Sequence, residues 1–186
     1  MKRIAAVLVV LALLPAGALL AAEQIQANAV RLGAGPSTGF FSAVIDRYTT
    51  PEEQARWREA FRSKGQDALV ALWQKEEPSV GTMSFEKTLG YRIRAAYSFP
   101  NEKGRRLVLV TDRPIAGVEV MRGARSMDYP IGWIEIDVDP EGKGEGKLYG
   151  AVELSVENEK LVVKTYGTEP IRLLSVRIEL KDEKKK

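Results

Sequence analysis

The feature that most constrains the fold is a strict alternation of apolar and polar residues, which recurs along the chain. Between Ile134 and Val138 every second residue is apolar, and the residues between them are Glu135 and Asp137. Successive side chains of a β-strand point to opposite faces, so this pattern predicts strands with one buried face. The pattern recurs in residues 41–45, 89–99, 152–157 and 174–180, and the continuously apolar residues 107–110 predict a strand covered on both faces.

Short polar segments separate the predicted strands. Residues 101–104 and 157–160 have the length and composition of hairpin turns, and residues 139–146 form a longer, glycine-rich connection. Strands joined by such short links pair antiparallel with each other. The sequence therefore predicts an antiparallel meander.

A segment after the early strand carries the signals of helices. Thr50 at the N-cap, Pro51 at the first position and Glu53 three residues after the cap form a capping box. Gly65 is typical of a helix end, and apolar residues resume at helical spacing after it. We therefore expect two helices, at about 51–64 and 67–76. The predicted fold class is α+β, a mainly antiparallel β meander forming a curled sheet, sandwich or open barrel, with an inserted two-helix segment.

The first 22 residues have the composition of a secretory signal peptide. Lys2 and Arg3 precede an apolar run that reaches Leu14, and small residues then offer cleavage points after Ala18 and Ala22. We favour cleavage after Ala22, and an uncleaved membrane anchor is the alternative. The absence of cysteine excludes a lipoprotein anchor. We expect an exported protein, periplasmic or extracellular, without a transmembrane span after cleavage. Its single domain would cover residues 23–180, followed by a disordered charged tail at 181–186.

The chain contains neither cysteine nor histidine. This excludes disulfides, thiolate and imidazole metal ligands, and catalysis that needs a histidine base or a thiol nucleophile. Of the 28 basic residues, Lys2 and Arg3 leave with the leader, so 26 remain against 25 acidic residues. A net charge so close to zero does not indicate a nucleic-acid partner, and we expect no cofactor.

Three segments of the chain carry a family resemblance: residues 104–115, residues 126–147 and residues 166–173, together with the stretch at 65–69. Over most of residues 40–178 the chain resembles a family of exported bacterial proteins of about this size, for which no activity is established. The resemblance implies export and a single domain, and it implies no function.

Two Asp-containing junctions between strands and loops provide the candidate ligand-binding site. One follows the apolar strand at 107–110, and the other precedes the strand that contains Ile134. If the junctions meet at one end of the sheet, they form a polar cluster on loops, where binding sites are common. Ordinary turns and ion pairs are the alternative. The candidate residues are Asp112, Arg113, Arg125, Asp128, Tyr129 and Trp133.

Acidic residues give two further hypotheses. Glu135 and Asp137 lie on one strand face with Cα atoms about 6.6 Å apart, a spacing compatible with the carboxylates of a glycoside hydrolase. Asp137, Asp139 and Glu141 imitate the start of a calcium-binding loop, although position 12 is Leu148 rather than glutamate. A solvated strand face and a hairpin turn are the respective alternatives.

Four arginines gather around one predicted hairpin and could hold an anionic group: Arg92, Arg94, Arg105 and Arg106. The leading hypothesis is an exported, non-enzymatic binding or envelope-associated domain for an apolar or anionic ligand, such as a small molecule, lipid or envelope component. The first alternative is a carboxylate-dependent hydrolase of envelope polymers. The second is a structural or assembly factor that binds a partner protein through a sheet edge.

Overall fold

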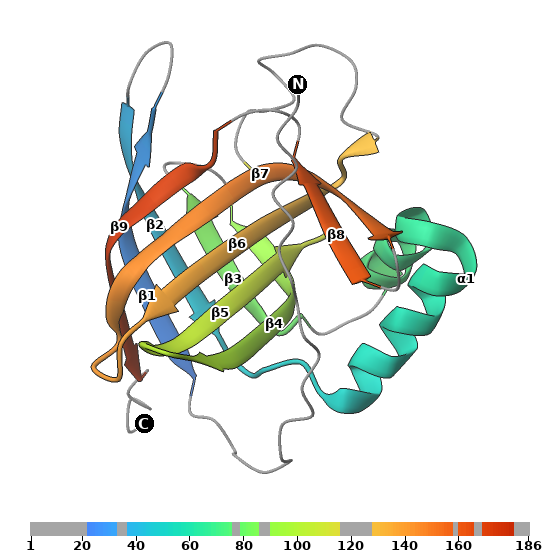
Figure 1. The fold of residues 1–186 in the computed structure, drawn as a ribbon, viewed down its shortest axis with the longest axis horizontal. Helices are drawn as coiled ribbons and strands as arrows, with labels where there is room; N and C mark the ends of the chain where they lie inside the picture. The colour runs from blue at the N-terminus through green and yellow to red at the C-terminus, as the bar shows by residue number, and fades with distance from the viewer. Residues whose placement is uncertain are drawn as a thin grey trace.

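The computed structural model describes residues 22–32, 37–75, 79–85, 90–115, 128–157, 160–165 and 169–180, which form one helix and nine strands (Figure 1). The helix α1 spans Pro51–Lys75. The strands are β1 (Glu23–Arg31), β2 (Ser37–Ile45), β3 (Gly81–Phe85), β4 (Tyr91–Asn101), β5 (Gly104–Thr111), β6 (Ile131–Val138), β7 (Lys143–Glu157), β8 (Lys160–Thr165) and β9 (Ile171–Leu180). Within these ranges, no helix has the length and apolar character needed to cross a membrane.

Eight strands close into an antiparallel barrel. They pair in the order β6-β5-β4-β3-β2-β1-β9-β7, and β6 pairs with β7 to complete the circle. The first part of β7 pairs with β6 and β9, and its last residues continue past the barrel to form a hairpin with β8. The prediction of a mainly antiparallel β structure is confirmed, and the sheet is a closed barrel rather than a sandwich or an open barrel.

The interior of the barrel is a filled apolar core. Inward side chains from all eight strands pack together, and Ile25, Phe41 and Leu109 are among those with 0% exposure. An eight-stranded barrel is just wide enough for its own side chains to fill. The inward side chains that the structure describes therefore form a core rather than a deep apolar pocket.

An ion pair lies at one end of the barrel, which we call the Glu23 end. The Glu23 carboxylate accepts hydrogen bonds from Nη1 and Nη2 of Arg105, both at 3.0 Å, and from the Tyr48 hydroxyl at 3.1 Å. Burial and the Glu23 charge raise the pKa of Tyr48, which keeps its hydroxyl protonated. Glu23 occupies an inward position of β1 in register with Ile25, so the cluster satisfies a buried charge where the apolar core ends.

At the opposite end, the chain after β5 folds back over the barrel. The Ile115 amide donates to the Gly150 carbonyl at 2.7 Å, and the Ile115 side chain joins the barrel core. The buried Thr111 hydroxyl accepts a hydrogen bond from the Gly132 amide and donates one to the Arg113 carbonyl. A Cβ on Gly132 would lie 2.5 Å from Ile115 Cδ1, so glycine is required for this close approach.

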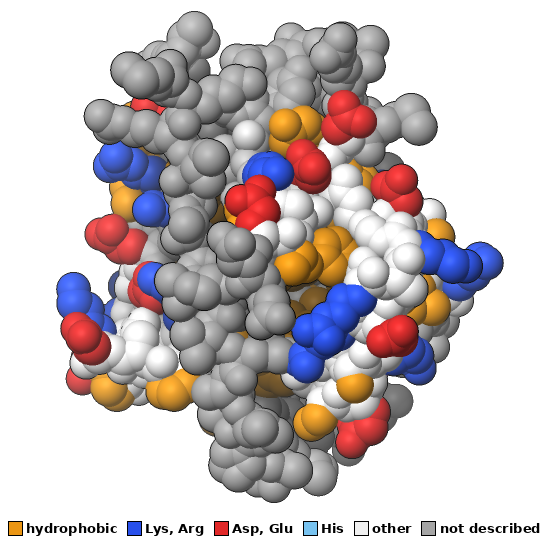
Figure 2. Space-filling view, turned by 45° about the vertical axis from the view of Figure 1, so that its right-hand side comes forward, with side chains coloured by type: hydrophobic (Ala, Val, Ile, Leu, Met, Phe, Trp, Pro, Cys, Tyr) orange, Lys and Arg blue, Asp and Glu red, His pale blue; other side chains and the backbone are white. Residues whose placement is uncertain are grey.

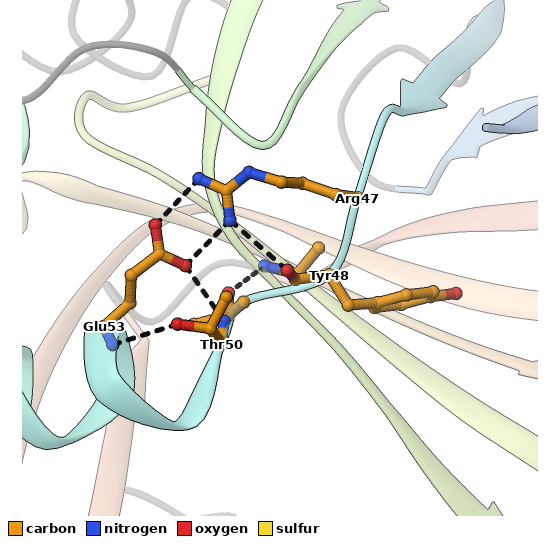
Figure 3. Close-up of polar contacts among 6 residues, drawn as sticks. Arg47, Tyr48, Thr50 and Glu53 are labelled. Carbon is orange, nitrogen blue, oxygen red and sulfur yellow. Dashed lines mark hydrogen bonds and ion pairs between the residues drawn. The ribbon is translucent and has the colours of Figure 1, made fainter. Parts of the chain in front are cut away.

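The predicted capping box is present at the start of α1. Thr50 Oγ1 accepts a hydrogen bond from the Glu53 amide, and Glu53 Oε2 accepts one from the Thr50 amide (Figure 3). Arg47 adds a bidentate ion pair to Glu53, with distances of 2.8 and 2.7 Å, and lowers the pKa of that carboxyl. The helical segment is one element, α1, rather than the two separate helices predicted. Its helical geometry is interrupted by a kink at Gly65, whose backbone is non-helical with a positive φ of 75°, at the position where the first helix was expected to end.

A second apolar core joins α1 to the outside of the barrel. Trp57 and Trp73 of α1 pack edge to face, with ring centroids 5.7 Å apart. They belong to a buried cluster that includes Val108 and Trp133 from the outer faces of β5 and β6, and Leu154 from the extension of β7. The helix and the β7–β8 hairpin therefore cover one part of the outer barrel surface (Figure 1).

Candidate functional site

A surface hollow lies on the outside of the barrel, near the Glu23 end. This outer groove has a volume of about 1030 Å³ and crosses the outer faces of β4, β5, β6, β7 and β9. Its lining combines apolar, acidic and basic side chains. They include Phe99, Val108 and Leu174; Glu102, Glu135, Asp137, Asp139 and Glu145; and Lys103, Arg106, Lys143, Lys147 and Arg172.

Asp137 is held firmly on the floor of the outer groove. Nε and Nη2 of Arg106 donate to its two carboxylate oxygens at 2.8 and 2.7 Å, and the Asn101 side-chain amide donates at 2.9 Å. These bonds lower the pKa of Asp137, and the same pairing raises the pKa of Arg106. Asp137 is therefore ionised and already neutralised by its neighbour.

Two other acids in the outer groove also have internal partners. Glu135 is buried and accepts a hydrogen bond from Trp133 Nε1 at 2.9 Å. Asp139 Oδ1 accepts the amide hydrogens of Glu141 and Lys143, both at 2.9 Å, which fixes the turn between β6 and β7. Both acids therefore make hydrogen bonds that stabilise the fold.

Two cations in the outer groove lack such partners. Lys147 of β7 lies directly opposite Arg172 of β9, and both side chains are exposed. Among the described residues, neither one forms an ion pair with a carboxylate. Glu135 lies opposite Lys147 on its other side and bonds to Trp133, and the charge of Lys147 adds to the lowering of the pKa of Asp137 by Arg106. Like charges opposite each other on neighbouring strands repel, so a further anion between Lys147 and Arg172 would relieve their repulsion.

Aromatic side chains border the charged part of the outer groove. Phe99 stacks on Tyr97, with ring centroids 6.0 Å apart and planes inclined by 23°. Burial raises the pKa of Tyr97 to about 12. Tyr149 of β7 also has a raised pKa because of burial and the charge of Glu135. Of these three rings, Phe99 is the one that lines the groove.

The structure divides the predicted ligand-binding cluster among three environments. Asp112 accepts a 2.7 Å hydrogen bond from Arg94, and Arg113 donates to the Gly90 carbonyl at 2.9 Å. Arg113 also lies over the Tyr91 ring, 4.6 Å from its centroid, so both residues are tied to β4.

The two junctions meet at one end of the barrel, because Thr111 pairs with Gly132. The Asp128 carbonyl accepts a hydrogen bond from Gln66 of α1, and Tyr129 follows it, half-buried. Trp133 belongs to the second core beneath α1. Arg125 lies outside the described residues. The contacts described for these residues are those of turns and ion pairs, and the ligand-binding cluster stays a prediction.

The calcium and arginine hypotheses find little geometric support. Asp137 and Asp139 have the partners given above, and the Glu141 carboxylate lies 3.9 Å from Lys143 Nζ. No group of three or more acidic side chains converges in the part of the chain that the structure describes. The four arginines do not share a face. Arg94 is buried against Asp112, Arg105 points into the barrel and Arg106 points out of it.

The sequence reasoning did not single out Lys147, Arg172 or Phe99. For Lys147 an alternating pattern was present in the sequence, since Glu145 and Lys147 alternate with Gly144, Gly146 and Leu148. What brings Lys147 beside Arg172 is the pairing of β7 with β9, which links segments that are not joined by a short turn. A pairing between strands that are distant in sequence cannot be predicted from local sequence patterns.

On the side that carries α1, acidic and basic side chains are interspersed among the described residues rather than gathered into a patch of one sign (Figure 2).

Comparisons with protein-family models, curated proteins and solved structures found no match. The resemblance to a family of exported bacterial proteins therefore stays a prediction, and the functional argument depends on the geometry of the outer groove.

Proposed function

We propose that the protein is an exported binding domain that holds an anionic ligand in the outer groove. The observation that carries the proposal is the juxtaposition of Lys147 and Arg172, two exposed cations without an ion-pair partner among the described residues. An anionic group between them would replace a repulsion by charge-assisted hydrogen bonds.

The filled barrel supports a site on the outside. A ligand in the interior would have to displace packed side chains such as Phe41 and Leu109, and that displacement would cost the energy of the core. The outer groove needs no such displacement. The filled interior therefore offers no site for an apolar ligand, whereas the outer groove offers a site for an anionic one.

The hydrogen bonds made within the groove leave a pair of cations with unused donors. Asp137, Glu135 and Asp139 already accept hydrogen bonds from Arg106, Trp133 and backbone amides. Glu102 and Glu145 also line the groove and form no ion pair among the described residues. Lys147 and Arg172 lie directly opposite each other, and their unused donors favour an anionic group at this pair.

The test is a calorimetric titration of residues 23–186 with inorganic polyphosphate at low salt. Replacing both cations, Lys147→Ala with Arg172→Ala, should weaken binding by at least about tenfold, because charge-assisted bonds are lost. The matched control is Arg62→Ala with Lys64→Ala, which removes the same charge from exposed positions of α1. Equal losses in the two double variants would mean nonspecific attraction and would refute the proposal.

A hydrolase of envelope polymers is the second candidate, because Glu135 and Asp137 line the same groove. The partners of Asp137 hold it ionised, so Glu135 would have to act as the acid. Release of reducing ends from an acidic polysaccharide, abolished by Glu135→Gln, would favour the hydrolase. Binding without release of reducing ends would favour the binding domain.

A further inference from the structure

The side chains of the outer groove form two rows across the strands. In one row Phe99, Arg106, Asp137 and Glu145 follow each other on β4, β5, β6 and β7. In the other row Val108, Glu135, Lys147 and Arg172 follow each other on β5, β6, β7 and β9. Since neighbouring strands are about 4.8 Å apart, each row extends over about 14 Å. The strands that carry the rows lie side by side (Figure 1).

We infer that the anionic ligand is an acidic polysaccharide that crosses these strands from Phe99 toward Arg172. This inference rests on the proposed function. The first row runs from the Phe99 ring through one base to two acids, and the second row runs from Val108 through one acid to the pair of cations. A chain of sugar rings can contact each kind of side chain, because its ring faces are apolar, its hydroxyls donate to carboxylates and its carboxylates accept from cations.

The acidic side chains between Phe99 and Arg172 favour a polysaccharide over other anionic polymers. Glu135, Asp137 and Glu145 would weaken the binding of polyphosphate, which has a charge on every small unit, more than that of a polysaccharide whose charges are separated by sugar rings. Sugar hydroxyls, by contrast, donate hydrogen bonds to carboxylates and accept them from arginine and lysine. Glu135 retains acceptor capacity for this purpose, because Trp133 Nε1 bonds to only one of its oxygens.

The groove also fits a sugar chain better than a lipid. An acyl chain needs a continuous apolar path, and Arg106, Asp137 and Glu135 interrupt the path between Phe99 and Leu174. A sugar ring has an apolar face that packs on an aromatic ring while its edge makes hydrogen bonds. Phe99 is already held by its stacking on Tyr97, so binding would not have to order this ring.

The experiment compares polygalacturonate with dextran, inorganic polyphosphate and phosphatidylglycerol vesicles as ligands of residues 23–186. Polygalacturonate should bind most tightly, and Lys147→Ala with Arg172→Ala should weaken it by about tenfold or more. Phe99→Leu keeps an apolar side chain but removes the ring face. It should weaken polygalacturonate by about threefold to tenfold and leave polyphosphate unchanged. Thermal melting of each variant establishes that it is folded, and Arg62→Ala with Lys64→Ala is the control for charge.

The outcomes separate the inference from the function on which it rests. If polyphosphate or the vesicles bind as tightly as polygalacturonate and Phe99→Leu has no effect, the polysaccharide inference is wrong and the anion site remains. If no anion binds, or if the Lys147 and Arg172 replacements change nothing, both are wrong. Equal binding of dextran and polygalacturonate would also overturn the inference, because the cation pair would then have no role.

Discussion

The ion pair at the Glu23 end provides the sharpest test of the energetics of the barrel. Glu23→Gln preserves size, replaces one accepting oxygen by a donor NH2 group and removes the negative charge that faces Arg105 and Tyr48. The Glu23 side chain is 4% exposed and that of Arg105 is 32% exposed. The substitution would therefore leave a partly buried guanidinium without its counter-ion.

The cost follows from burial. Removing one member of a fully buried ion pair costs about 3–5 kcal/mol, whereas exposed pairs contribute about 0–1 kcal/mol. Because water reaches a third of Arg105, we expect a loss of about 2–3 kcal/mol in the free energy of unfolding. The pair between Arg106 and Asp137 is the control, since it is also bidentate but is 41% and 46% exposed. Asp137→Asn should cost about 1 kcal/mol or less.

The assay is urea denaturation of residues 23–186, with Glu23→Gln, Arg105→Met and the double variant forming a cycle. The double variant should be less destabilised than the sum of the single variants, because the charges are then removed together. A loss for Glu23→Gln no greater than that for Asp137→Asn would refute the reasoning. The Glu23 end would then be open to water in solution.

Three further predictions follow from particular contacts. Gly132→Ala should destabilise the protein by about 1–3 kcal/mol, since its Cβ would overlap Ile115, and an unchanged midpoint in urea would contradict this packing. The pKa of Glu53 lies below its ordinary value of 4.5 because of Arg47, so this pair stabilises the fold above that pH and less as the pH falls through the lowered pKa. In melting curves between about pH 6 and pH 3, Glu53→Gln should accordingly lose less stability than the wild type does. If export cleaves the bond Ala22–Glu23, the intact mass of the exported protein should correspond to residues 23–186, and a mass that includes residues 19–22 would favour the cut after Ala18.

The local parts of the fold were predictable because their signals are local. The capping box needs only Thr50 and Glu53, and both of its hydrogen bonds are present. The turn at 101–104 joins paired strands, with Asn101 opposite Gly104. Alternation placed Ile134 and Ile136 inward and Glu135 outward, as the barrel has them. These features depend on neighbours in sequence, which is the information that a pattern contains.

The closure of the barrel was not predictable from such patterns. It depends on the pairing of β1 with β9, at opposite ends of the chain. The alternation in β1 was overlooked, because its inward residues after Ile25 are Ala27 and Ala29, and alanine is a weak apolar signal. Glu23 in the inward register weakened the pattern further, since its partner Arg105 is distant in sequence.

A bulge explains why the face of β4 was misjudged. The odd positions of residues 89–99 alternate as if they shared one buried face. The register shifts between Ile93 and Ala95, so Ile93 points into the barrel while Tyr97 and Phe99 contribute to the outer surface. An extra residue in one strand moves all later side chains to the other face. Phe99 reaches the outer groove for this reason.

The central claim is that ligand binds outside the barrel, between Phe99 and Arg172, and the most direct measurement is an amide NMR titration of residues 23–186 with polygalacturonate oligomers. The account predicts shifts concentrated at 99–108, 135–147 and 172–174, with the inward core around Phe41 and Leu109 unperturbed. Shifts centred on the barrel interior, or on Asp112 and Arg113 at the opposite end, would contradict it.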